Sequence, residues 1–179
     1  YLESIGKEPN RLNAIHTGTP DSVWSTNINT NLIIDYFGSK GLNYIPDNLK
    51  HITNWNANQD DLSRAINEGT FLVQHRDHGV FQAWNNPYFS NNEIDDLYNE
   101  DLTFIMSANC QTGDFSYGDD DNDCFAERFL RIENGAVAVV AASQVSYSYV
   151  NDTYVWGFYD YLWNDFIPDY GCNDIEFKY

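Results

Sequence analysis

The chain has 179 residues and a mass of 20.6 kDa, a size that suits one domain with a buried core. Hydrophobic residues make up 42% of it and aromatic residues 16%, which excludes a disordered tail, and no apolar run is long enough for a transmembrane helix. A net charge of −18 disfavours nucleic acid and anionic membranes as partners and favours cations or basic polypeptides, with solubility alone as the alternative reading of this charge.

Strands and helices alternate along the first half of the chain. In chain order, the predicted elements are a strand in residues 11–18, a helix in 27–41, a short strand in 41–47, a helix in 58–69 and a strand in 70–75. The helix in 58–69 has Asp60 or Asp61 near its start and Gly69 at its end, which is the usual asymmetry of helix termini.

The second half continues the alternation. Its predicted elements are a short helix in 90–99, a strand in 102–108, a helix in 123–135, a strand in 135–143 and an aromatic helix in 152–166. Strands that are apolar throughout and separated by helices are typical of a mostly parallel sheet with helices on both faces. The sequence therefore predicts an α/β fold with three layers.

Residues that could carry chemistry follow two of these strands. His75, Asp77 and His78 come at or after the end of one strand, and Cys110 comes after the end of another. Ligands of a parallel sheet bind beyond the carboxyl ends of its strands, so we expect these residues on the functional edge. A thiol and an imidazole presented there can act together: the thiolate attacks a carbonyl and the imidazole protonates the leaving amine.

Gly79, directly after His78, lets the backbone turn tightly and brings an N–H group toward the place where an oxyanion would need a donor. The alternative is a buried inert cysteine with an unrelated loop histidine, and both interpretations stay open here. Zinc is a further alternative, because His75 and His78 have H-x-x-H spacing and Asp77 and Cys110 could add ligands. No second close ligand pair accompanies them, so this signal is weak.

The segment from Gly118 to Cys124 concentrates negative charge. Its carboxylates could hold calcium, but the spacing is not that of an EF-hand loop, and a solvated acidic loop is the alternative. The three cysteines, Cys110, Cys124 and Cys172, are an odd number, so a single disulfide would leave one thiol free. Few lysines together with many Asn, Asp and Tyr predict a secreted or cell-surface protein.

Five segments, in order, carry a family resemblance: QHRDHGVFQAW, FIMSANCQTGDF, CFAERFLR, GAVAVVAAS and YVWG. They resemble the catalytic domain of the gingipain-type cysteine peptidases, relatives of the caspases, and the resemblance runs from about Asp21 to Trp163. It implies a caspase-like three-layer sandwich, with a mostly parallel central sheet flanked by helices. It also implies that residues 1–179 form a single catalytic subdomain, the carboxyl-terminal half of a longer catalytic region.

The resemblance implies a cysteine endopeptidase that hydrolyses peptide bonds through an acyl-enzyme intermediate. His78 would be the general base and acid, and Cys110 the nucleophile. The N–H groups of Gly79 and Cys110 would form the oxyanion hole, and Cys124 matches a structural cysteine.

Gingipain-type enzymes also orient the histidine with an acidic residue well upstream, and Asp21 occupies the matching place, three residues before Trp24. A carboxylate that accepts the imidazole N–H would fix the tautomer and stabilise the charged ring. The alternative for Asp21 is a helix N-cap or a turn residue beside Pro20. Asp77 is the fallback for this role, although neighbours on an extended segment face opposite sides.

The chain departs from the family in several respects. Gingipain catalytic regions carry an additional amino-terminal subdomain, so such a subdomain or a propeptide is an expected partner besides protein or peptide substrates. His75 and Arg76 replace small residues, and would narrow the cleft, bind a substrate carboxylate or simply face solvent in a loop. Gingipains bind calcium structurally, so structural calcium is expected, although the chemistry itself needs no cofactor. The resemblance does not assign its ligands among Asp119, Asp120, Asp121 and Asp123.

The segment after the last predicted strand carries an expectation about specificity. In the lysine-specific gingipain, an aromatic residue and an aspartate three positions later meet the substrate's basic side chain, and Tyr149 and Asp152 fall on those places. An aromatic wall would hold the apolar stem of Lys or Arg, and a carboxylate would attract its charged end. The alternative is that Asp152 is the N-cap of the helix that follows.

A second function class also stays open, namely a non-catalytic secreted binding module on a peptidase-like fold. Five Trp and 13 Tyr could stack on sugars or peptides, although most aromatic residues in a domain of this size belong to the core. Fast alkylation of a thiol near neutral pH would indicate an active site, and slow alkylation would favour the binding module.

Overall fold

A parallel sheet forms the centre of the structure. The computed structural model describes residues 14–17, 58–85, 87–116 and 122–162; the helix expected in 27–41 and the strand expected in 41–47 lie outside these ranges. The strands of the sheet are β1 (Ala14–Thr17), β2 (Leu72–His75), β6 (Thr103–Ser107) and β7 (Ala136–Ala141). They lie in the order β1-β2-β6-β7, and each neighbouring pair is parallel. The predicted parallel sheet is therefore confirmed.

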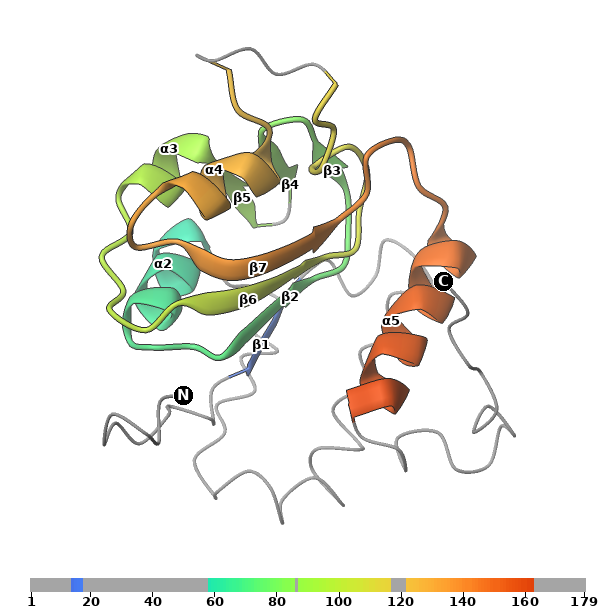
Figure 1. Ribbon diagram of the computed structural model, residues 1–179, viewed down its shortest axis with the longest axis horizontal. Helices are drawn as coiled ribbons and strands as arrows, with labels where there is room; N and C mark the ends of the chain where they lie inside the picture. The colour runs from blue at the N-terminus through green and yellow to red at the C-terminus, as the bar shows by residue number, and fades with distance from the viewer. Residues whose placement is uncertain (1–13, 18–57, 86, 117–121, 163–179) are drawn as a thin grey trace.

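Helices cover both faces of this sheet (Figure 1). They are α2 (Gln59–Asn67), α3 (Asn91–Asp95), α4 (Phe125–Arg131) and α5 (Ser148–Leu162). Successive residues of a strand face opposite sides of a sheet. Ile105 of β6 accordingly packs in the core with α2, α3 and α4, whereas the ring of Phe104 stacks on Phe158 of α5 with 5.2 Å between centroids. The predicted three layers are confirmed. No helix within the described ranges is long and apolar enough to cross a membrane.

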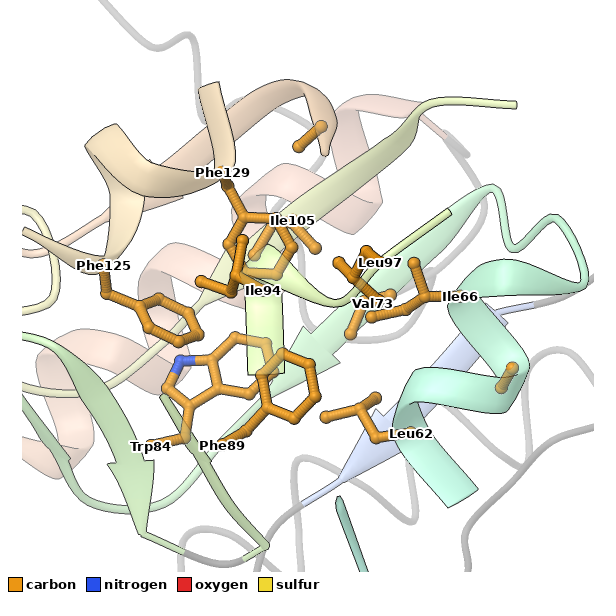
Figure 2. Packing of buried hydrophobic residues seen from close by; sticks show 12 residues of the cluster. Leu62, Ile66, Val73, Trp84, Phe89, Ile94, Leu97, Ile105, Phe125 and Phe129 are labelled. Carbon is orange, nitrogen blue, oxygen red and sulfur yellow. The ribbon is translucent and has the colours of Figure 1, made fainter. Parts of the chain in front are cut away.

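The main core lies between the sheet and helices α2, α3 and α4 (Figure 2). Its buried residues are Leu62, Ala65, Ile66, Val73, Trp84, Phe89, Ile94, Leu97, Ile105, Phe125, Phe129 and Ala136. The indole of Trp84 lies 4.7 Å from the ring of Phe125, and Phe125 meets Phe129 edge-on at 5.1 Å. Because Trp84 is fully buried, its N–H needs a partner, and it donates to Oγ of Ser107 at 2.7 Å. The core thus reaches the carboxyl end of β6.

A small antiparallel sheet follows β2, and sequence periodicity does not predict it. Its strands are β3 (Gly79–Val80), β4 (Ala83–Asn85) and β5 (Tyr88–Ser90). Strands of two or three residues are too short to show a period of alternation. The sheet brings Trp84 and Phe89 into the core and covers the end of β2.

Helix boundaries also differ from the predicted ones. Helix α5 begins at Ser148, so Asp152 lies inside it and the N-cap interpretation of Asp152 is wrong. Helix α4 ends at Arg131, before the predicted end near Gly135. There the chain passes back against the helix: a Cβ on Gly135 would lie 2.0 Å from the carbonyl oxygen of Phe129. Helix α2 agrees with its prediction, with Gly69 at a φ of 92° just past its end.

Candidate active site

The proposed nucleophile and base stand at the same edge of the central sheet. His75 and Ser107 are the last paired residues of β2 and β6. His78 and Cys110 follow these two residues, each at the same distance along the chain. The two segments also touch, because a Cβ built on Gly79 would lie 2.9 Å from the carbonyl oxygen of Cys110. The structure thus brings both sequence-predicted residues to neighbouring strand ends.

Gly79 occupies a position that admits no side chain. A Cβ there would lie 2.4 Å from Oδ1 of Asn109, well inside contact distance. Gly79 lies opposite Trp84 of β4. The hydrogen bond beside this pair runs from the N–H of Asn85 to the carbonyl of His78 at 3.1 Å, so Gly79 and Trp84 are a pair without hydrogen bonds to each other. In an antiparallel ladder this pattern directs the N–H of Gly79 away from β4. That N–H therefore points out of the small sheet, and the segment of Cys110 is the neighbour of Gly79 on its Cα side.

Of the two described cysteines, Cys110 is the accessible one. Its side chain is half-buried, and His78 is exposed. Cys124, by contrast, is fully buried at the N-terminus of α4. Burial raises the pKa of the Cys124 thiol to about 11, so Cys124 stays protonated near neutral pH. A reacting thiol must be reachable, and only Cys110 of this pair meets that condition.

His75 is the last residue of β2 and is buried, so the alternative that it faces solvent in a loop is wrong. Its ring is fully buried and stacks on the indole of Trp84, with 4.5 Å between centroids and 4° between planes. Its Nδ1 lies 2.7 Å from Nδ2 of Asn109. An amide nitrogen donates and does not accept, so Nδ1 of His75 is the acceptor in this assignment of the amide.

Asn109, which directly precedes Cys110, lies at the centre of this buried polar cluster. Its Oδ1 accepts hydrogen bonds from Oγ of Ser107 at 3.1 Å and from Oγ1 of Thr112 at 2.8 Å. With the bond to His75, the whole side chain of Asn109 is held. Sequence reasoning missed this residue, because an asparagine after a strand is a common turn residue. The cluster fixes the backbone from which Cys110 projects.

Cys110 lies next to a sharp turn. The residue after it, Gln111, has a φ of 58°, in the left-handed region that non-glycine residues rarely adopt. The N–H of Gln111 donates to the carbonyl of Gln144 at 3.1 Å, and the N–H of Gly113 donates to that of Ala142 at 3.0 Å. These bonds to the loop after β7 hold the turn in place. Strain of this kind persists where the surrounding structure enforces it, often at functional sites.

Ser146, in the loop after β7, contacts the nucleophile directly. Its backbone N–H and carbonyl oxygen both lie 3.5 Å from Sγ of Cys110. Its hydroxyl donates to the carbonyl of Asn109 at 2.8 Å and accepts a bond from Nδ2 of Asn151 at 2.9 Å. The sequence pointed to this loop only as a pocket wall, so the contact between Ser146 and the sulfur is new.

The end of the histidine segment is joined to α5. Nε of Arg76 donates to Oδ1 of Asp152 at 2.9 Å, and each of the two side chains is 4% exposed. Arg76 is therefore buried and ion-paired, which corrects the alternative that it faces solvent. Asp77, the fallback for orienting the imidazole, accepts a bond of 2.6 Å from the backbone N–H of His78. Asp21 and the side chain of Tyr149 lie outside the described residues.

Two places in the sequence also raised metal ligation as an alternative, namely zinc at the histidine segment and calcium in the acidic loop. The described residues contain no group of three or more His, Cys, Asp or Glu side chains that could hold a metal ion, so the zinc alternative is not supported. Asp119, Asp120 and Asp121 lie outside the described residues.

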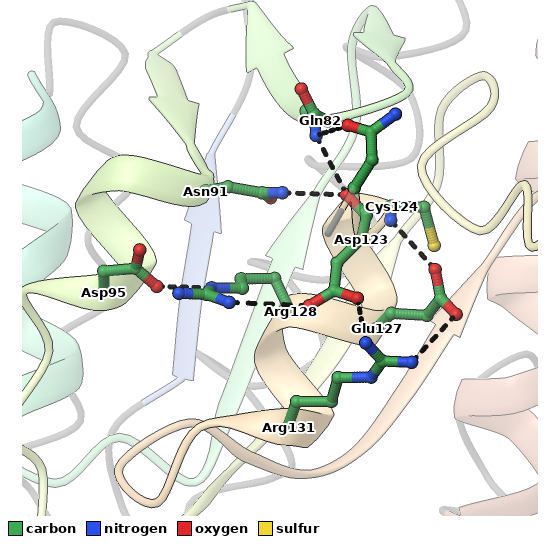
Figure 3. A network of polar contacts seen from close by, with 9 residues as sticks. Gln82, Asn91, Asp95, Asp123, Cys124, Glu127, Arg128 and Arg131 are labelled. Atoms are coloured by element: carbon green, nitrogen blue, oxygen red, sulfur yellow. Dashed lines mark hydrogen bonds and ion pairs between the residues drawn. The ribbon is translucent and has the colours of Figure 1, made fainter. Parts of the chain in front are cut away.

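Asp123, which closes the acidic loop, is largely buried in a network of charges (Figure 3). Its carboxylate pairs with Arg131 and, at 3.5 Å, with Arg128, which also binds Asp95. The hydrogen bond to Asp95 is the main cause of the raised pKa of Arg128. A carboxylate already shared by two arginines does not fit a calcium ligand, because the cations would repel each other.

Comparison with known proteins shows the family. The profile of peptidase family C25 matches residues 10–174. No curated protein sequence gives a match. Three solved structures are similar, all at 24% identity or less, so they show the fold alone.

The first of these structures is described only as a protease, with a TM-score of 0.67 and 20% identity over 82% of this chain and 32% of that chain. The second is the Arg-specific cysteine proteinase gingipain R, with a TM-score of 0.54 and 24% identity over 78% of this chain and 35% of that one. The third is a complex of the pro- and mature domains of RgpB from Porphyromonas gingivalis, with a TM-score of 0.56 and 24% identity over 83% of this chain and 38% of that one. The chain thus spans about a third of each solved chain, and the caspase-like fold is confirmed.

Proposed function

Because the chain belongs to peptidase family C25, we propose that it is the catalytic part of a cysteine peptidase, with Cys110 as nucleophile and His78 as general base and acid. One observation carries the assignment: His78 and Cys110 stand at matched positions beyond the last paired residues of β2 and β6. The exposure of His78 and the access to the Cys110 thiol support it.

The proposed reaction begins when the imidazole of His78 takes the proton from the thiol of Cys110. Sγ then attacks the carbonyl carbon of the substrate, and the negative oxygen that forms is held by the N–H groups of Gly79 and Cys110. His78 returns the proton to the leaving amine as the peptide bond breaks, which leaves a thioester on Cys110. Water, activated by His78, then hydrolyses the thioester to a carboxylic acid and restores the thiol. Asp21 is proposed to accept the imidazole N–H and to hold the ring in the required tautomer.

We also propose a preference for lysine or arginine before the scissile bond, with Tyr149 and Asp152 at the pocket. The net charge of −18 supports it, because a negative protein attracts basic segments over long range. The carboxylate of Asp152 is already paired with Arg76, so a substrate cation would have to share it. We therefore expect long-range attraction to carry more of this preference than the Asp152 contact does.

The remaining parts of the proposal concern the setting of the enzyme. Protein or peptide substrates follow from the family, and a propeptide partner is supported by the related complex of pro- and mature domains. We propose a secreted or cell-surface location from the composition, and structural calcium at a place that excludes the carboxylate of Asp123.

The test is hydrolysis of fluorogenic peptide amides that differ at the residue before the scissile bond. Cys110→Ala and His78→Ala should each reduce kcat/KM by orders of magnitude, because the two residues work as a unit. Cys124→Ser is the matched control: it also removes a thiol, but serine is a favourable residue at the N-cap of α4, so activity should persist. Normal turnover by Cys110→Ala would refute the assignment. No turnover by any form, together with alkylation of Cys110 as slow as that of Cys124, would favour a non-catalytic binding module.

A further inference from the structure

The first turns of α5 are linked to both of the segments that carry the proposed dyad, directly to Arg76 and, through Ser146, to Asn109 and Cys110. Asn151 and Asp152 are adjacent in this helix. We propose that this pair of residues positions the nucleophile and the base relative to each other. The inference rests on the proposed function and names residues that act on Cys110 and His78 through other side chains.

Asn151 reaches the nucleophile through Ser146. Its Nδ2 donates to Oγ of Ser146 at 2.9 Å, and that hydroxyl donates in turn to the carbonyl of Asn109 at 2.8 Å. A hydroxyl that accepts one bond and donates another has a fixed orientation. The same serine places its backbone N–H 3.5 Å from Sγ of Cys110. Asn151 therefore helps to fix both the peptide before Cys110 and a donor aimed at its sulfur.

Asp152 reaches the base through Arg76. The two side chains form a buried ion pair, with Nε of Arg76 2.9 Å from Oδ1 of Asp152. Arg76 lies between β2 and His78 in the chain, so the pair ties this connection to α5. A charge-assisted bond in a buried setting is short and directional, and removing one partner of a buried ion pair is strongly destabilising. The backbone that leads to His78 is thus held from the same helix.

Helix α5 is itself well anchored, so it can serve as a common support. Val155 and Tyr159 are fully buried, and the ring of Phe158 stacks on Phe104 of β6. Strand β6 also leads to Cys110. Helix α5 therefore packs on the strand that precedes Cys110 and is ion-paired with the segment that precedes His78. Asp152 would thus help to position His78 through Arg76, and this role does not depend on the charge of the substrate.

The experiment compares four variants with the wild type: Asn151→Ala, Ser146→Ala, the double variant Arg76→Met with Asp152→Leu, and Tyr161→Ser. The double variant removes both charges together, since removing one partner of a buried ion pair is strongly destabilising. Tyr161 is in the same helix but is 81% exposed, so Tyr161→Ser is the matched control. Circular dichroism checks folding, and two quantities are measured: the kcat and KM for Lys, Arg and Leu peptide amides, and the rate of Cys110 alkylation by iodoacetamide.

We expect Asn151→Ala, Ser146→Ala and the double variant to lose about 10-fold or more in kcat with all three peptides, because small displacements of reacting groups are costly. KM should stay nearly constant for all three peptides in Asn151→Ala and Ser146→Ala, and for the Leu peptide in the double variant, which also lacks the proposed pocket carboxylate. The alkylation rate of Cys110 should change in Asn151→Ala and Ser146→Ala but not in Tyr161→Ser. Folded variants with the wild-type kcat and alkylation rate would overturn the inference. If the double variant does not fold, Asn151→Ala and Ser146→Ala decide. If the wild type shows no Cys110-dependent turnover, the proposed function fails, and the alkylation rates alone then decide whether α5 controls the thiol.

Discussion

Nδ1 of His75 lies 2.7 Å from the side-chain amide of Asn109, so the last residue of β2 is bonded to the residue that precedes the proposed nucleophile. The bond crosses from the strand that leads to His78 to the strand that leads to Cys110. Because both side chains are buried, the contact is shielded from water and its geometry is well defined.

Asn109→Ala should therefore affect both stability and catalysis. The change leaves the buried His75, Ser107 and Thr112 without the amide partner, which costs about 1–3 kcal/mol for each group that stays unsatisfied. We expect a lower free energy of unfolding and a lower kcat. Denaturant titration and peptide hydrolysis measure these, with Asn92→Ala at an exposed position as control. Unchanged stability in the Asn109 variant would show that the cluster does not hold the site together.

Gly79→Ala should strongly reduce activity. Its methyl group would collide with Oδ1 of Asn109 and with the carbonyl of Cys110, so one of the two segments must move. A displacement of about 1 Å at a reacting group can cost about 100-fold in rate, and we expect at least that loss in kcat. Val80→Ala, at the exposed neighbouring position, is the control. An active Gly79→Ala enzyme would mean that the contact between these segments is not needed for catalysis.

The buried thiol of Cys124 predicts a dependence of stability on alkaline pH. Its pKa is about 11 in the folded protein and near 9 when unfolded, so ionisation favours the unfolded state. The protonated Cys124 thiol contributes fully to the free energy of unfolding below about pH 9, and this contribution is lost as the pH rises toward about 11. Thermal unfolding followed across this range should show a steeper loss in the wild type than in Cys124→Ser. Equal slopes in the two proteins would contradict the assignment of this thiol as the titrating group.

The preference for basic peptides should depend on salt. If the net charge of −18 attracts lysine and arginine substrates, raising the ionic strength should lower their kcat/KM, because charges are screened beyond about 10 Å at 0.1 M salt. A leucine peptide serves as the control and should respond little. A different result would contradict this. If the ratio of kcat/KM for the Lys and Leu peptides does not change with salt but falls to about one in Asp152→Asn, Asp152 is the local specificity residue, despite its pairing with Arg76.

Much of the fold could be predicted from the sequence, because its long elements have clear periods. The apolar runs of β2, β6 and β7 and the bounded helix α2 lie close to where the patterns place them. The positions of His78 and Cys110 beyond two strands follow from the same patterns. Strands β3 to β5 do not, since two or three residues show no period.

The contacts that shape the site were beyond prediction for a different reason. The burial of His75 depends on Trp84, which β4 folds over it, and β4 itself was not expected. The pairing of Arg76 with Asp152 joins residues that are 76 positions apart, and no local pattern signals such a pair. Helix α5 begins at Ser148 and not at the predicted residue 152. Asp152 therefore lies inside the helix, where it pairs with Arg76, and is not its N-cap.

The central claim is that Cys110 attacks the substrate with the help of His78, and an acid-quenched single turnover tests it most directly. A peptide p-nitrophenyl ester with lysine at its carboxyl end is mixed with excess enzyme, the reaction is stopped in acid, and peptide mapping by mass spectrometry locates the acyl group. We predict the acyl group on Cys110 in the wild type, and in His78→Ala the same adduct forming more slowly by about 100-fold or more. An acyl group on any other residue, or equally fast acylation of Cys110 without His78, would contradict the account.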